Sequence, residues 1–141
     1  MPAPVTIPVD IKGQPHRLVF KFGTVAFFEE ATGQNLFSAF PFLGMMADAT
    51  QDAARKAADA VEWRMWGSLF WAVLQPEHRI TKDGAFDLID QAGIEQVTVW
   101  CMAGLMAYAS GDAKVAELLL AEFEKAGKKP AGEAGPAKKG K

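Results

Sequence analysis

The sequence predicts an α+β domain that is mainly helical, in which an N-terminal β-hairpin packs on a bundle of about five helices. Two patterns carry this prediction: apolar residues alternate with polar ones near the N-terminus, and they recur at helical spacing in several later segments. The chain has 141 residues, half of them hydrophobic, which suffices for one domain with its own core. We expect residues 1–127 to form this domain and residues 128–141 to be a disordered basic tail.

The hairpin is predicted over residues 5–22. Alternating apolar residues mark one strand at Val5, Ile7, Val9 and Ile11, and the other at Leu18, Phe20 and Phe22. A period of two is typical of a strand with one buried face. Residues 12–15, KGQP, have the composition of the connecting turn. Pro8 has no amide hydrogen to donate to a neighbouring strand, so its strand is expected at an edge.

Residues 59–75, DAVEWRMWGSLFWAVLQ, hold three of the four tryptophans and are predicted to lie in the central helix. Their apolar side chains cover more than one stripe, whereas a surface helix needs only one. Two explanations stay open: the helix is buried within the domain, or a partner chain covers one of its faces. Because Asp52 can cap the helix and Pro76 can stop it, we expect it to run from Ala53 to Gln75.

Shorter helices are predicted from their capping residues and apolar spacing. Their expected ranges are 25–32 after Thr24, 36–40 after Asn35, 82–92 after Thr81, 94–109, and 113–126 before Gly127. Ala103, Gly104 and Ala107 would let another helix approach closely, and the Trp-rich helix is the expected neighbour.

Charge and composition exclude several classes of function. Residues 128–141 carry five lysines and one glutamate, a net charge of +4, so the net −2 of the chain leaves −6 on residues 1–127. An acidic body argues against nucleic-acid binding, which needs clustered Lys and Arg. Without a signal peptide or a long apolar run, the chain is predicted to be soluble, cytoplasmic and not membrane-bound. The single cysteine, Cys101, is expected to be a buried thiol.

No catalytic, metal-binding or cofactor-binding motif is present in the sequence. The two histidines, His16 and His78, lie far apart in sequence and are interpreted as an exposed spacer and a loop residue. The carboxylates of Asp83, Asp87 and Asp90 lack the spacing of a calcium loop and are interpreted as a solvated face. We therefore predict a protein that is not an enzyme and needs no cofactor or metal.

The segment from Pro41 to Asp52 contains apolar residues that would be unusual in water, among them Phe42, Met45 and Met46. Methionine-rich segments either fill gaps in a core or form adaptable binding surfaces, and both readings stay open here.

Three strings carry a family resemblance: LVFKFGTVAFFEEATGQNLF, WGSLFWAVLQPEHRIT and KDGAFDLIDQAGIEQV. Together with the order of elements, they resemble the small tail assembly chaperones of long-tailed bacteriophages and the related prophage and gene-transfer-agent proteins. The matching residues of the first string are Glu29, Glu30, Thr32, Gly33 and Leu36, and those around the third are Thr81, Ala85, Leu88, Ile89 and Asp90. The resemblance covers about residues 5–100.

The resemblance implies a protein of the host cytoplasm that coats the tape measure protein, keeps it soluble, helps to recruit tail tube subunits and is absent from the mature virion. Self-association is compatible with this role. The expected client contacts are the exposed parts of Trp63, Trp66, Phe70 and Trp71, with Phe42, Met45 and Met46 as a flap. Two alternatives stay open: a structural head-tail connector or tail-completion component, and a small bacterial adaptor unrelated to phage that shares only the helical pattern.

Overall fold

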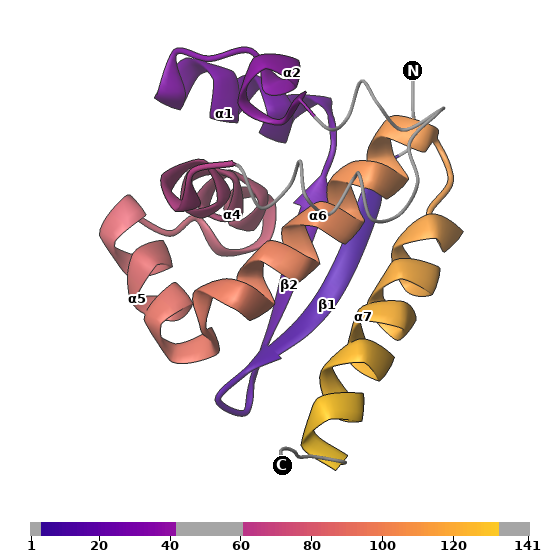
Figure 1. Cartoon of the computed structure of the whole chain (residues 1–141). Helices are drawn as coiled ribbons and strands as arrows, with labels where there is room; N and C mark the ends of the chain where they lie inside the picture. Colours follow the sequence, from indigo (N-terminus) through magenta and orange to yellow (C-terminus); the bar gives the residue numbers. More distant parts are fainter. Residues whose placement is uncertain (1–3, 42–60, 133–141) are drawn as a thin grey trace.

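The computed structural model describes residues 4–41 and 61–132 of the chain (Figure 1). A two-stranded antiparallel hairpin comes first and several helices pack against it, which confirms the predicted mainly helical α+β class. Both α4 and α6 contact the hairpin, so its apolar face is covered by helices. In Figure 1, α1 and α2 lie above α4, and α6 crosses in front of the strands.

The hairpin consists of β1, Val5–Ile11, and β2, Gln14–Phe20, paired from Val5 opposite Phe20 to Ile11 opposite Gln14. Lys12 and Gly13 alone make the turn, and both have positive φ, 53° and 82°, as a tight two-residue hairpin turn requires. The predicted four-residue turn is therefore too long. The predicted strand end at residue 22 is also wrong, because Phe22 is exposed in the first turn of α1.

Helix α1, Phe22–Thr32, begins earlier than predicted, yet Thr24 still closes its first turn. The Thr24 hydroxyl accepts a hydrogen bond from the Lys21 amide at 2.9 Å and donates one to the Lys21 carbonyl at 2.7 Å. Helix α2, Leu36–Ala39, is capped as predicted by the side chain of Asn35. The Glu29 carboxylate accepts a hydrogen bond from the Leu36 amide, which links α1 to α2.

Helix α4, Trp63–His78, begins later in the sequence than predicted and also ends later. Val61 and Glu62 are not helical, and the predicted stretch from Ala53 to residue 60 lies outside the described residues. The helix continues through Pro76 to His78. A proline removes one donor but does not prevent the next residues from completing a turn, and the Arg79 amide still donates to the Gln75 carbonyl.

The middle of α4 is the centre of the core. It contacts β2, α1, α5 and α6, so several of its faces are covered by other elements of the same chain. The buried residues of this helix include Trp66, Leu69, Phe70, Val73 and Leu74. Of the two explanations for the Trp-rich stretch, burial within the domain therefore applies to these residues, and coverage by a partner chain does not.

Helices α5, Lys82–Ala92, and α6, Ile94–Ser110, follow with Thr81 as the N-cap of α5 and Gly93 between them, close to the prediction. The Trp-rich helix α4 contacts α6, as expected, but it is not the neighbour of Gly104. A Cβ atom there would overlap the Phe20 ring, so strand β2, not the Trp-rich helix, occupies the space that the glycine leaves.

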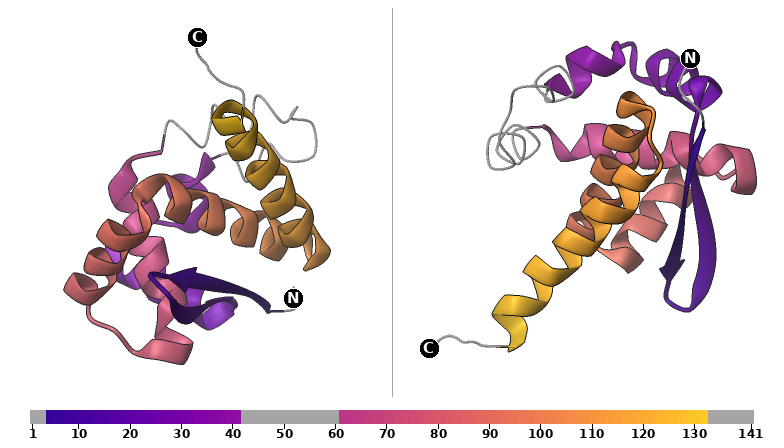
Figure 2. Two further views of the ribbon diagram at one scale, coloured as in Figure 1. Left: turned by 90° about the horizontal axis from the view of Figure 1, so that it is seen from below. Right: turned by 90° about the vertical axis from the view of Figure 1, so that its right-hand side faces the viewer.

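Helix α7, Lys114–Gly132, packs chiefly on α6 and extends away from the rest of the domain (Figure 2). It runs past Gly127, where the sequence predicted its end. Glycine lowers helix stability by about 1 kcal/mol relative to alanine but does not force a helix to stop. The predicted tail therefore begins inside the helix, and residues 133–141 lie outside the described residues.

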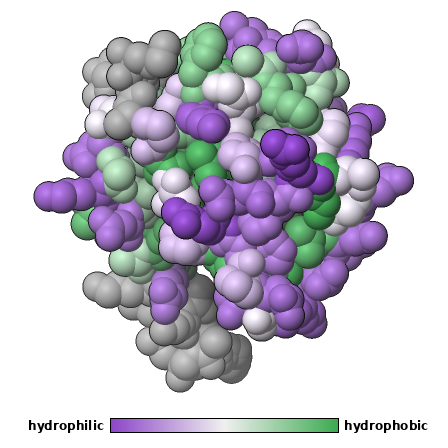
Figure 3. Space-filling model, turned by 180° about the vertical axis from the view of Figure 1, so that it is seen from behind, coloured by the Kyte–Doolittle hydropathy of each residue, from purple (hydrophilic) through white to green (hydrophobic). Residues whose placement is uncertain are grey.

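The outer surface of the hairpin is polar. Thr6, Pro8 and Asp10 are the exposed residues of the alternating pattern in β1. Seen from behind the view of Figure 1, the surface is mainly hydrophilic, with smaller apolar areas between the polar ones (Figure 3). Within residues 4–41 and 61–132, no helix is long and apolar enough to cross a membrane.

Candidate partner-binding site

An apolar cleft of about 410 Å³ opens where the first turn of α4, the helix α5 and the first turn of α6 meet. Its lining consists of Trp63, Gly67, Phe86, Ile89, Asp90 and Ile94. Five of these six residues carry no charge and the sixth is an exposed carboxylate. A concave apolar surface with few polar groups is the usual form of a binding site for an apolar ligand or side chain.

Gly67 makes the floor of the cleft. A Cβ atom at this position would lie 3.3 Å from Cε1 of Phe86 and 3.4 Å from Cδ1 of Ile89, so α4 and α5 approach closely here. Because glycine has no side chain, the Phe86 and Ile89 side chains reach the α4 backbone and remain partly exposed along one side. Trp63 and Ile94, each at the first residue of its helix, stand at the rim.

Trp63 is the only one of the four aromatic residues expected to contact a client that is largely exposed, with 63% of its surface accessible. Trp66 and Phe70 are 2% and 0% exposed, so the expectation that they form part of a contact surface is wrong. The Trp66 ring lies 4.7 Å from the Phe40 ring, and packing with such aromatic neighbours explains its burial.

Trp71 is half-buried and engaged within the domain. Its indole Nε1 donates a hydrogen bond of 2.9 Å to the Ile80 carbonyl, and the Phe27 ring packs edge-on against it at 4.9 Å. The Lys82 ammonium lies 6.0 Å from the Trp71 ring and 5.7 Å from the Phe86 ring. These contacts show how Trp71 is held, and they leave Trp63 as the accessible tryptophan of the cleft.

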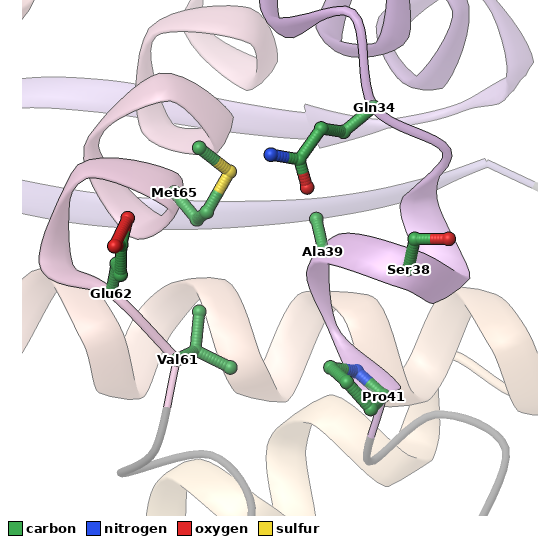
Figure 4. Close-up of a pocket in the computed structure, with 7 residues that line it drawn as sticks. All are labelled: Gln34, Ser38, Ala39, Pro41, Val61, Glu62 and Met65. Carbon is green, nitrogen blue, oxygen red and sulfur yellow. The ribbon is translucent and has the colours of Figure 1, made fainter.

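The other three expected contact residues, Phe42, Met45 and Met46, lie outside the described residues. A second cavity of about 320 Å³ lies next to them in the sequence, between the end of α2 and the start of α4 (Figure 4). Its lining is Gln34, Ser38, Ala39, Pro41, Val61, Glu62 and Met65. This cavity is more polar than the cleft at Trp63, and so less suited to an apolar partner.

The charges beside the apolar cleft are unequal on its two sides. On α5, Asp83, Asp87 and Asp90 are all exposed, and their spacing of four and three residues places them along one edge of the helix. We call these three residues the acidic edge. On the other side, the residues that α4 and α6 contribute to the lining, Trp63, Gly67 and Ile94, carry no charge.

Sequence reasoning missed a contact between the only two histidines. The rings of His16 on β2 and His78 at the end of α4 lie 4.9 Å apart, and His78 Nε2 accepts a hydrogen bond from the Arg17 amide at 3.1 Å. Burial, and to a lesser extent His16, lower the pKa of His78, while Glu77 opposes them. No sequence signal reveals this pair, because the fold brings together positions 62 residues apart.

Neither the cysteine nor a cluster of metal ligands provides a reactive site in the described part of the chain. Cys101 is fully buried, and burial raises the pKa of its thiol far above the ordinary value, so it does not form a thiolate at neutral pH. Among the described residues, no three His, Cys, Asp or Glu side chains gather in a group that could hold a metal ion.

The cleft is thus the feature of the described surface best suited to binding, and its chemistry is apolar contact beside negative charge. Comparison of the chain with protein-family models, with curated proteins and with solved structures finds no match.

Proposed function

We propose that this protein is a tail assembly chaperone of a long-tailed phage or a related particle, which binds apolar helical segments of the tape measure protein. In this role it keeps the client soluble in the host cytoplasm and helps to recruit tail tube subunits. The observation that carries the proposal is Trp63, which stands exposed beside an apolar cleft although the other tryptophans of α4 are packed within the domain.

An exposed tryptophan beside an apolar cleft is well suited to bind a partner. Aromatic side chains at the edge of an apolar pocket dominate the affinity of protein interfaces, since a partner that covers them buries a large apolar area. Removing such an anchor costs about 2 kcal/mol or more, which corresponds to roughly 30-fold in affinity. A chaperone that must later leave its client can use one small cleft per copy and many copies along the client.

The family resemblance and the cleft share residues. The string KDGAFDLIDQAGIEQV, which carries part of the resemblance, spans α5 and the start of α6 and supplies Phe86, Ile89, Asp90 and Ile94. The proposal has no role for catalysis, in keeping with the absence of a catalytic motif in the sequence.

The test is co-expression with the long helical product of a neighbouring gene. The protein should keep that product soluble and co-purify with it, and Trp63→Asp should abolish both effects. The matched control is Phe37→Asp, since Phe37 is 58% exposed but lies outside the cleft. Circular dichroism checks that both variants fold.

Two results would contradict the proposal. The first is a client that stays insoluble with the unaltered protein. The second is this protein in purified particles as a stoichiometric component, which would instead favour the head-tail connector or tail-completion alternative.

A further inference from the structure

We propose that the occupant of the Trp63 cleft is one apolar ridge of an amphipathic helix that carries Lys or Arg along the edge facing α5. This inference rests on the proposed function and names the chemistry of the client segment. Three features of the cleft support it: its volume, the elements that line it, and the unequal charges on its two sides.

The volume of the cleft limits what can enter. A helix with its side chains is about 10 Å wide and rises 5.4 Å per turn, so one turn occupies roughly 420 Å³. The cleft holds about 410 Å³, so a helix of several turns cannot enter it whole. Such a helix would instead lie across the opening and insert the side chains of one ridge between Trp63 and Phe86.

The lining favours a helix over an extended strand as the partner. Every residue of the cleft belongs to α4, α5 or α6, so the cleft has no strand edge to which an extended partner could add. A strand bound there would leave its own backbone groups unpaired, whereas a helix satisfies them internally. The mode that fits is therefore a helix in a groove, with anchors spaced three and four residues apart.

The negative charges on α5 favour a partner helix with basic residues over one with acidic residues. The acidic edge lies immediately beside Phe86 and Ile89 on α5, and within the described residues none of its three carboxylates has an ion-pair partner. The nearest cation on the same helix, Lys82, lies against the rings of Trp71 and Phe86. A partner with acidic residues at this edge would be repelled, and one with basic residues would be attracted.

The lining residues that α4 and α6 contribute, Trp63, Gly67 and Ile94, carry no charge and give no such preference. The bound helix should therefore carry its positive charges on one side of its apolar ridge only.

The test uses the purified full chain and two synthetic 18-residue amphipathic helices with the same leucine ridge. One peptide has lysine along one edge of the ridge and the other has glutamate at the same positions. Fluorescence anisotropy of the labelled peptides measures both affinities at low and high salt. We expect the lysine peptide to bind about fivefold tighter or more at low salt, and the difference to shrink as salt screens the charges.

Two pairs of variants connect the preference to the site. Asp87→Asn with Asp90→Asn should remove most of the preference, while Asp83 is kept because it stabilises the first turn of α5. Asp10→Asn with Glu30→Gln changes the net charge equally at exposed positions outside the cleft and should keep the preference.

Equal affinity for the two peptides, binding of neither, or a preference that survives the change of Asp87 and Asp90 would overturn the inference. Its failure can be told apart from failure of the proposed function. Trp63-dependent rescue of the tape measure protein without a peptide preference removes only the inference about charge. A clear preference without rescue leaves the cleft as a binding site for basic amphipathic helices and removes the chaperone role.

Discussion

The two ends of α4 differ in how far their side chains are engaged by other parts of the chain. At its C-terminal end, Gln75 and Trp71 both donate to the Ile80 carbonyl, and His78 accepts a hydrogen bond from β2. At its N-terminal end, the helix has no side-chain cap, and Trp63 is exposed beside an apolar cleft. One end is therefore closed by contacts within the chain, and the other is left open to a partner.

The aromatic content of α4 does not by itself locate a binding surface. Trp63, Trp66 and Trp71 lie within nine residues of one another, yet they are exposed, buried and half-buried. Only the element that packs on each face of the helix separates them. Phe40 packs against Trp66 and Phe27 packs against Trp71, whereas 63% of the Trp63 surface stays exposed beside the cleft.

The largest effect is expected in the closed middle of α4. Trp66→Ala should destabilise the domain by about 3–5 kcal/mol, because it leaves a large cavity in a packed core. Urea unfolding followed by circular dichroism measures the change. Phe37→Ala, at an exposed aromatic residue, should stay within about 0.5 kcal/mol. Similar stability losses for the two variants would contradict the division into closed and open regions.

A smaller effect is expected at the C-terminal end of α4. His78→Ala removes the acceptor for the Arg17 amide and the contact with His16, and should cost about 1 kcal/mol of unfolding free energy. Glu77→Ala changes the neighbouring exposed residue and serves as the control in the same urea titration. If His78→Ala has no greater effect than Glu77→Ala, the link between β2 and α4 does not contribute to stability.

The same histidine predicts a dependence of stability on pH. The pKa of His78 is lowered from 6.5 in the folded chain, so the unfolded chain takes up a proton first as the pH falls. Stability should be constant above this range, decline as the pH falls below 6.5, and level off below the folded pKa. Urea midpoints between pH 7.5 and pH 5 measure the decline. His78→Ala should make it shallower, and an unchanged decline would assign it to other groups.

The smallest effect on stability is expected at the open end. Trp63→Ala should change the unfolding free energy by no more than about 0.5 kcal/mol, because most of the side chain is already in contact with water. The same variant should lose binding of the lysine-edged peptide. A marked loss of stability would show that Trp63 belongs to the core, and the contrast between the two ends of α4 would disappear.

Much of the fold could be predicted from local patterns. The alternation from Val5 to Ile11, the caps at Asn35 and Thr81, and the glycine at position 33 with φ of 72° act through near neighbours in the chain, and each is confirmed. The errors fall at element ends. Residues 14 and 15 belong to β2, and α4 continues through Pro76, because pairing and packing outweigh local stop signals.

The candidate site could be predicted only in part. Trp63 was expected to contact a partner, but nothing in the sequence distinguishes it from Trp66, since both lie in the same apolar stretch. Asp83, Asp87 and Asp90 were interpreted as a solvated face, and they are exposed. Their position beside Phe86 and Ile89, at the opening of a cleft, depends on how α5 meets α4 at Gly67.

By itself, the sequence determined the class of fold, the location of most helices and the presence of more apolar surface than one helix face needs, because these follow from spacing and capping along the chain. The tertiary structure alone decided which apolar residues stay in water and which distant residues meet, as His16 and His78 do. The physical reason is that burial is a property of the neighbours that a side chain acquires on folding. Those neighbours come from elements distant in sequence.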